Sequence, residues 1–183
     1  MPTNGMPRLN HAELGAQRTR LENGAATDHR RSHPKLSLSI QLDDQAGDCP
    51  VSRPQLRRWA QAALLTDARL TLRLVGLAEG RALNRQFRGR DYATNVLTFA
   101  YGNPVPTSQA TAPIEADIII CLRVVAREAR AQRKALHDHL AHLVVHGCLH
   151  AQGLDHETPR QAQEMEALET RLLARFRIAD PYR

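Results

Sequence analysis

Three histidines in a short stretch constrain the fold of this chain most strongly. The stretch VHGCLHAQGLDH, residues 145–156, contains His146, His150 and His156. On a helix that turns about 100° per residue, His146 and His150 differ by about 40° and point their imidazoles in nearly the same direction. Gly153 is suited to end that helix in a left-handed conformation, after which the chain can fold back and deliver His156. The spacing therefore predicts three imidazoles that converge at one helix end.

Three neutral imidazoles with an open fourth position are typical of a catalytic zinc site, whereas structural zinc sites are closed. We therefore predict that His146, His150 and His156 bind one zinc ion. His142 lies one turn earlier and forms its own i, i+4 pair with His146, so periodicity alone also permits a site at that pair. The return of the chain after the helix favours the later pair. We expect His142 and Asp155 to lie beside the site, in contact with a ligand or with substrate.

The histidine spacing equals that of the metzincin proteases, HExxHxxGxxH. In those enzymes the glutamate after the first histidine is the general base for peptide hydrolysis. Gly147 occupies that position here, and its side chain can neither accept nor donate a proton. The sequence keeps the metal-binding spacing but disfavours peptidase chemistry.

The order of the predicted elements indicates an α+β fold. Apolar alternation predicts strands at residues 35–42 and 69–76, and β-branched and aromatic residues or a buried apolar run predict two more at 94–101 and 114–121. Strands come early and helices late, so we expect an α/β sandwich on a mixed four-stranded sheet. Helices are predicted after Ser52 and over residues 77–87, 122–133, 134–152 and 159–176.

The 183 residues suffice for one domain with a hydrophobic core. Residues 1–34 are polar and show no sustained hydrophobic period, which predicts a disordered extension. We expect residues 35–183 to form a single metallohydrolase domain. No apolar run approaches the roughly 18 residues of a membrane span, and residues 1–34 contain no apolar signal region. Three separated cysteines without a CxxC pair indicate a reducing compartment, so we expect a cytoplasmic protein.

The chain is basic, with a formal net charge of +6 and a pI near 9.9. Lysine occurs only at Lys35 and Lys134, and every other basic residue that is not histidine is arginine. Arginine suits bidentate contacts to phosphate, although a genome rich in arginine codons also explains its abundance. The charge therefore permits a nucleic-acid partner without requiring one.

Four segments, in the same order along the chain, resemble the YbeY family of bacterial single-strand-specific endoribonucleases. The histidine stretch is similar to the family's HGxLHxxGyDH, and residues 83–99, LNRQFRGRDYATNVLTF, are similar to its LNxxyRxxDxxTdVLSF. Residues 116–120 resemble its GDIxI strand, and Met165 and Glu169 resemble the MxxxE of its final helix. The departures are mild: Asn95 stands where aspartate is frequent, and Leu154 replaces a tyrosine that could have stacked on a base.

The resemblance implies an endoribonuclease with one zinc ion that acts in ribosomal RNA maturation, at the 3′ end of the small-subunit RNA, and in ribosome quality control. It implies single-stranded and ribosomal RNA, the small ribosomal subunit and assembly factors as partners. An invariant arginine of the family maps to Arg88. A guanidinium can hold two phosphate oxygens while charge builds on them, so we predict that Arg88 is catalytic and binds the scissile phosphate. The nucleophile, water or the ribose 2′-hydroxyl, stays open.

Two other functions are compatible with the same residues. The chain could be a non-catalytic ribosome assembly factor in which zinc stabilises the fold and positions RNA. It could also be a zinc peptidase, which would need a carboxylate to replace the base that Gly147 lacks.

Overall fold

The computed structural model describes residues 33–102 and 112–183, so the predicted extension, residues 1–34, lies outside the described residues except for its last two. The unit that begins at Pro34 contains four strands and five helices in its described part. In chain order they are β1 (Leu36–Leu42), α2 (Arg53–Ala62), β2 (Ala68–Val75), α3 (Leu77–Arg88), β3 (Val96–Tyr101), β4 (Ile114–Cys121), α4 (Leu122–Ala131), α5 (Leu136–Ala151) and α6 (Pro159–Ala174).

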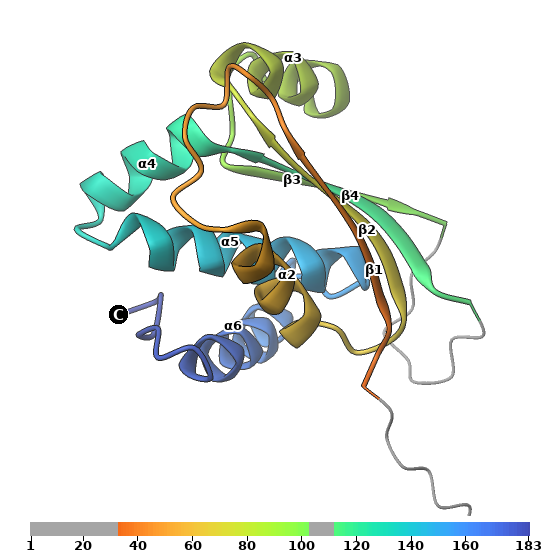
Figure 1. Cartoon of the computed structure of the whole chain (residues 1–183). Coiled ribbons are helices and arrows are strands. Elements are labelled where there is room, and N and C mark those ends of the chain that lie inside the picture. Colours follow the sequence, from red (N-terminus) through yellow and green to blue (C-terminus); the bar gives the residue numbers. More distant parts are fainter. Residues whose placement is uncertain (1–32, 103–111) are drawn as a thin grey trace, which may run out of the picture. The chain divides into compact units, whose positions relative to one another are not determined.

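The four strands form one mixed sheet in the order β1-β2-β4-β3. β1, β2 and β4 are parallel, and β3 pairs antiparallel with β4 at one edge. Parallel neighbours need a crossover connection, which α2 provides between β1 and β2. In Figure 1, α5 runs across one face of the sheet and α3 lies on the other face. The predicted α+β fold with a mixed four-stranded sheet is confirmed.

Several elements begin where the sequence supplies a local hydrogen-bonding group. Ser52 accepts a hydrogen bond from the backbone of Gln55 at the start of α2, and Thr158 forms a capping box at the start of α6. β3 begins at Val96, two residues later than predicted. There the Asn95 side chain accepts the backbone N–H of Val96 at 2.7 Å, which ends the preceding turn.

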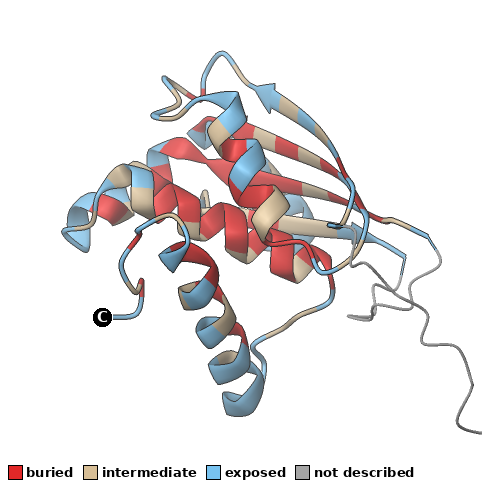
Figure 2. Ribbon diagram, turned by 60° about the horizontal axis from the view of Figure 1, so that its bottom comes forward, coloured by how far each residue is buried: buried red, intermediate tan, exposed pale blue. Residues whose placement is uncertain are grey.

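Helix α5 is the centre of the hydrophobic core. It packs against β3 and β4 on one side and against α2, α4 and α6 around the rest of its circumference. Figure 2 shows its buried residues as an almost continuous band, in contact with the buried side of the sheet. Beyond its first turn, α5 is partly open where His142, His146 and His150 are half-buried. None of the helices in the described residues has the length and hydrophobicity of a membrane span.

Gly147 lies where the backbone of α5 closely approaches the sheet. A Cβ atom at this position would lie 2.7 Å from Cγ2 of Ile118 and 3.4 Å from Oγ1 of Thr98. The glycine therefore lets the helix backbone approach β3 and β4, and this approach carries the neighbouring His146 to the edge of the sheet. A carboxylate at position 147 would enter the sheet, so the absent protease base also has a packing explanation.

We predict that Gly147→Ala destabilises the protein by about 1–3 kcal/mol, because the added methyl overpacks the contact with Ile118. Helix propensity alone predicts the opposite sign, a gain of about 1 kcal/mol. Urea unfolding measures the difference. Gly80→Ala in α3 is the matched control, since its nearest neighbour would be Cys121 Cβ at 3.3 Å and the cost should be smaller. A stabilised Gly147→Ala variant would contradict the close-approach account.

Candidate metal centre

The structure brings the three predicted histidines together. One ring nitrogen from each of His146, His150 and His156 lies within 4.8 Å of the other two. The Nε2 atoms of His146 and His150, one turn apart on α5, are separated by 3.1 Å. The side chains are half-buried or exposed, so one side of the cluster remains accessible. The predicted convergence at one helix end is therefore present.

The turn after α5 delivers the third histidine as the spacing predicts. Gly153 has a φ of +84°, and its N–H donates to the carbonyl of His150. The carboxylate of Asp155 then accepts the backbone N–H of His156 at 2.8 Å. Asp155 thus lies beside the site, as expected, and holds His156 through its backbone.

The distance between the two Nε2 atoms matches the requirement of a zinc ion. Two nitrogens bound to one tetrahedral zinc at about 2.05 Å lie about 3.3 Å apart. The observed separation of His146 and His150 is 3.1 Å, so a shared ion needs almost no movement of either ring. Three imidazoles are also a donor set that zinc accepts in open sites. The residues present therefore fit the predicted ion.

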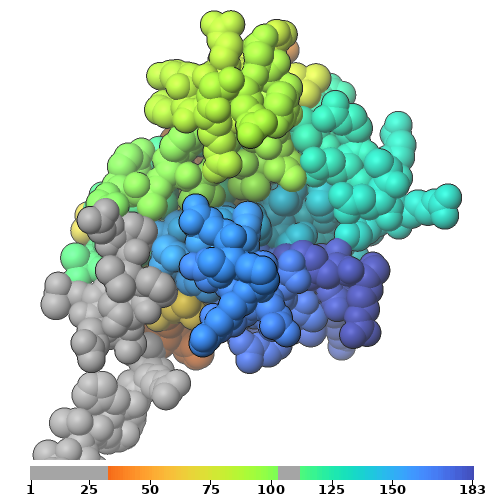
Figure 3. All heavy atoms as spheres, turned by 180° about the vertical axis from the view of Figure 1, so that it is seen from behind, coloured from red at the N-terminus to blue at the C-terminus, as the bar shows by residue number. Residues whose placement is uncertain are grey.

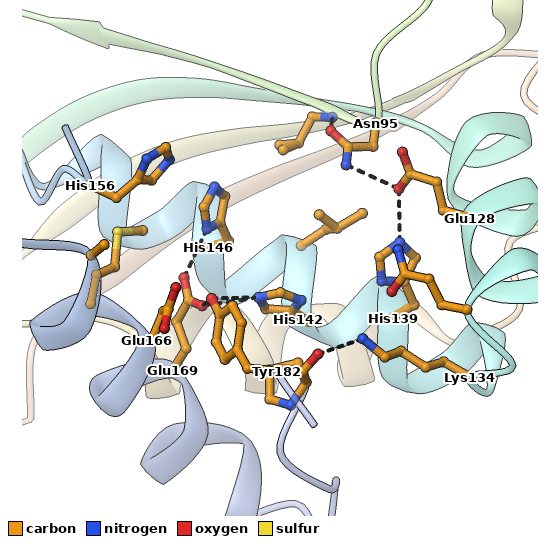
Figure 4. Close-up of a pocket in the computed structure, with 16 residues that line it drawn as sticks. Asn95, Glu128, Lys134, His139, His142, His146, His156, Glu166, Glu169 and Tyr182 are labelled. Atoms are coloured by element: carbon orange, nitrogen blue, oxygen red, sulfur yellow. Dashed lines mark hydrogen bonds and ion pairs between the residues drawn. The ribbon is translucent and has the colours of Figure 1, made fainter. Parts of the chain in front are cut away.

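A buried carboxylate orients His146. Nδ1 of His146 donates to Oε1 of Glu169 at 2.8 Å, and the Glu169 side chain on α6 is fully buried (Figure 4). A proton on Nδ1 leaves the lone pair on Nε2, the atom that faces His150. The carboxylate also makes the imidazole a more basic ligand. Glu169 therefore sets both the tautomer and the direction of His146.

Glu169 is ionised in this environment despite its burial. Burial by itself would raise the pKa of its carboxyl, but hydrogen bonds from His142, His146 and Tyr182 outweigh it and lower the pKa to about 2. Burial and the contact with Glu169 together raise the pKa of the Tyr182 hydroxyl, which stays a hydrogen-bond donor. The site therefore contains a fixed negative charge behind His146.

His142 lies beside His146 and contacts Glu169. Its Nε2 is 3.0 Å from Oε2 of Glu169, and the rings of His142 and His146 are 6.0 Å apart between centroids. His142, His146 and Glu169 also form a second group with metal-ligand spacing. In that group the carboxylate already accepts hydrogen bonds from both imidazoles, so an ion would have to displace two protons. The three-histidine group needs no such rearrangement.

His150 is prepared to act as a neutral ligand. Burial, followed by the proximity of His146 and His156, lowers the pKa of His150 to about 4. The imidazole is therefore uncharged near neutral pH, the form that binds a metal.

Cys148, on the opposite side of α5, is fully buried, and burial raises the pKa of its thiol to about 12.

Arg88 shares a pocket with the three histidines. It is the last residue of α3, and Gly89 follows with a φ of +67°. The pocket has a volume of about 500 Å³ and is also lined by Thr94, Thr98, Asp155 and Glu157. In Figure 3, α3 lies above and the connection between α5 and α6 below on the same side of the molecule. The structure thus brings Arg88, predicted from a segment 58 residues before His146, to the histidine cluster.

The fold and the site together define an α+β protein with a candidate three-histidine metal centre and an arginine beside it. A family model described as endoribonuclease YbeY matches residues 41–177. The chain belongs to the YbeY endoribonuclease family. A relative from Bordetella pertussis, named endoribonuclease YbeY, is 56% identical over 158 residues, which cover 81% of this chain and 96% of the relative. A relative of the same name from Cupriavidus pinatubonensis is 47% identical over 176 residues, covering 95% and 85%.

A solved structure has the same fold. The solution structure of a Thermotoga maritima protein is 25% identical to this chain, with a TM-score of 0.52. The match covers 76% of this chain and 91% of the other.

Two residues of the site were not assigned by the sequence. Glu169 was noted only in a motif similar to the family's, and Tyr182 was not singled out. A signal for Glu169 was present, because it shares an apolar stripe of α6 with the buried residues Met165, Leu172 and Leu173. A charged residue on such a stripe is rarely buried unless it is paired.

We predict that His150→Ala removes the bound metal, whereas His142→Ala retains most of it. His150 faces the cluster directly, while His142 reaches it only through Glu169. Metal content per folded protein, measured by atomic emission, distinguishes the two variants. The reverse pattern would move the site one turn back, to the group formed with Glu169.

We predict that Glu169→Gln lowers zinc affinity about 10- to 100-fold, because the amide supports the ligand tautomer of His146 less well. Competition with a chromogenic chelator measures the affinity. Glu166→Gln is the matched control, since Glu166 is an exposed residue of α6 that lines a neighbouring cavity. Equal affinities of the two variants would contradict the orienting role of Glu169.

Proposed function

We propose that this chain is a zinc-dependent endoribonuclease that cleaves single-stranded RNA at the three-histidine centre. The observation that carries this proposal is the shared pocket, in which Arg88 lies with His146, His150 and His156. The relatives named endoribonuclease YbeY support RNA as the substrate. The formal net charge of the chain, +6, agrees with a polyanionic partner.

The charged residues and the histidines of the pocket each have a role in phosphodiester cleavage. The Arg88 guanidinium binds two oxygens of the scissile phosphate and stabilises the charge that develops on them. His146, His150 and His156 would hold the zinc ion, which when bound would supply Lewis acidity to the reaction. Asp155 and Glu157 line the same pocket, so a proton released by the nucleophile has a carboxylate to accept it.

The recessed position of the centre supports a preference for single strands. The histidines lie in a pocket between α3 and the turn after α5, and His146 and His150 are half-buried. A phosphate can reach such a recess when its neighbours are splayed apart, which a single strand allows and a stacked duplex resists.

Membership of the family also suggests which RNA is cleaved, which partners bind and in which compartment. We propose ribosomal RNA, at the 3′ end of the small-subunit RNA, as the substrate, and the small ribosomal subunit with its assembly factors as partners. Ribosome quality control in the cytoplasm is the proposed setting. The free thiols of Cys49, Cys121 and Cys148 agree with a reducing compartment. Residues 35–183 are proposed to be the single metallohydrolase domain and residues 1–34 a disordered extension.

We predict that Arg88→Ala abolishes RNA cleavage, with a loss of at least about 100-fold in kcat, while zinc content and fold are kept. The guanidinium contributes to the reaction and is not needed for packing, since Arg88 is exposed. Cleavage of a labelled single-stranded RNA measures the loss. Arg85→Ala is the matched control, because Arg85 is an exposed arginine of the same helix outside the pocket.

Unchanged cleavage by the zinc-loaded Arg88→Ala variant would contradict the role of Arg88. If the wild-type protein binds RNA but does not cleave it, the chain is a non-catalytic assembly factor. Cleavage of an unstructured protein in place of RNA would identify a zinc peptidase.

A further inference from the structure

A second hollow lies on the other side of the histidine cluster from Arg88. This groove has a volume of about 460 Å³ and runs along α5 (Figure 4). Its floor is formed by His139, His142, Leu143 and His146, and none of the roles proposed above uses the space over them. We call it the α5 groove.

The α5 groove is continuous with the pocket that contains Arg88. Both hollows are lined by Asn95, Val96, His146 and His156. A molecule bound at the histidines can therefore extend in two directions, toward Arg88 or along α5. From His146 to His139 the helix rises about 10 Å, so the groove has room for one nucleoside and not for a longer segment.

The two hollows differ in charge. The α5 groove contains three carboxylates, those of Glu128, Glu166 and Glu169, and one cation, Lys134. Nζ of Lys134 donates to the carbonyl of Pro181, so this charge is already engaged at the rim. Such a lining disfavours a phosphate group in the α5 groove. The pocket on the other side also contains two carboxylates, those of Asp155 and Glu157, but there the Arg88 guanidinium can bind a phosphate.

The groove is also shaped for a flat, partly apolar group. Val96, Leu143, Met165 and the ring of Tyr182 contribute apolar surface to its walls. Apolar and aromatic walls with a few polar groups are typical of sites that bind small rings. A nucleobase is neutral, has apolar faces, and carries N–H donors at its edge that carboxylates accept.

The far wall is held in place without a ligand. Oε2 of Glu128 lies 2.9 Å from Nε2 of His139 and accepts a hydrogen bond from the Asn95 side chain at 3.0 Å. Asn95 is itself fixed by the backbone N–H of Val96. The network ties α4, α5 and the start of β3 together, so contacts within the protein fix the shape of this wall.

We propose that the α5 groove is a nucleobase subsite. It takes the base of a nucleotide next to the scissile phosphate, while that phosphate lies at the histidines and Arg88. This inference rests on the proposed function and adds a contact that positions the RNA strand. It predicts that one base, at a fixed position relative to the cleaved bond, contributes to recognition.

The test combines a variant that fills the groove with a substrate that lacks the base. Ala162, a half-buried residue of α6, lines the groove and is not part of the metal site. Ala162→Phe should fill the space, and Ala167→Phe on the exposed side of α6 is the matched control. Both are made in the full chain and checked for zinc content and thermal unfolding. The substrates are a single-stranded oligoribonucleotide with one mapped cleavage position and a series with single abasic nucleotides around it.

We expect Ala162→Phe to lower kcat/KM on the intact oligonucleotide at least about tenfold, the effect of losing one stacked base, and Ala167→Phe to leave it unchanged. One abasic position should cause a similar loss with the wild-type protein. On that abasic substrate, Ala162→Phe should cause no further loss, because both changes remove the same contact.

The proposal is overturned if Ala162→Phe cleaves as well as the wild type, or if its effect multiplies with that of every abasic position. Equilibrium binding of the same oligonucleotides compares the two variants and the abasic positions without depending on cleavage. If the zinc-loaded wild type does not cleave the oligonucleotide, the proposed function is contradicted. If it cleaves but its binding does not depend on any base, only the subsite is contradicted.

Discussion

The geometry of the site depends on one buried carboxylate. Glu169 has no exposed side-chain surface and accepts hydrogen bonds from His142, His146 and Tyr182. A carboxylate in such a position is tolerated only when donors surround it, because burial of an unpaired charge is costly. The three donors come from α5 and from the segment after α6, so the arrangement that stabilises the charge also holds these elements in register. The direction of the His146 lone pair follows from it.

A second constraint places that histidine at the edge of the sheet. The glycine at position 147 brings α5 into contact with Ile118 of β4, and the helix also packs against β3. Thr98 and Val96 of β3 line the pocket of Arg88. The histidine cluster thus separates two hollows that both contain carboxylates, and of the two the pocket on the β3 side contains the Arg88 guanidinium. Together they suit the two parts of a nucleotide, phosphate and base.

Local patterns predicted most of this structure, and contacts between distant segments account for the rest. Apolar alternation predicted β1 and β2, and β-branched residues or an apolar run predicted β3 and β4, since these signals depend only on residues within each element. The i, i+4 spacing of His146 and His150 predicted their convergence, because a helix fixes side-chain directions. The pairing of His146 with Glu169 joins residues 23 apart on two helices, and no spacing rule determines how α6 docks on α5. The α5 groove also depends on how α6 docks on α5, so the sequence did not predict it.

We infer that three imidazoles hold the metal and that Glu169 orients one of them from behind. A crystal structure of the zinc-loaded protein, with anomalous scattering recorded at the zinc edge, tests it most directly. We expect one ion about 2.0–2.1 Å from a ring nitrogen of each of His146, His150 and His156, with Glu169 still hydrogen-bonded to Nδ1 of His146. An ion bound between His142, His146 and the carboxylate of Glu169 would contradict it.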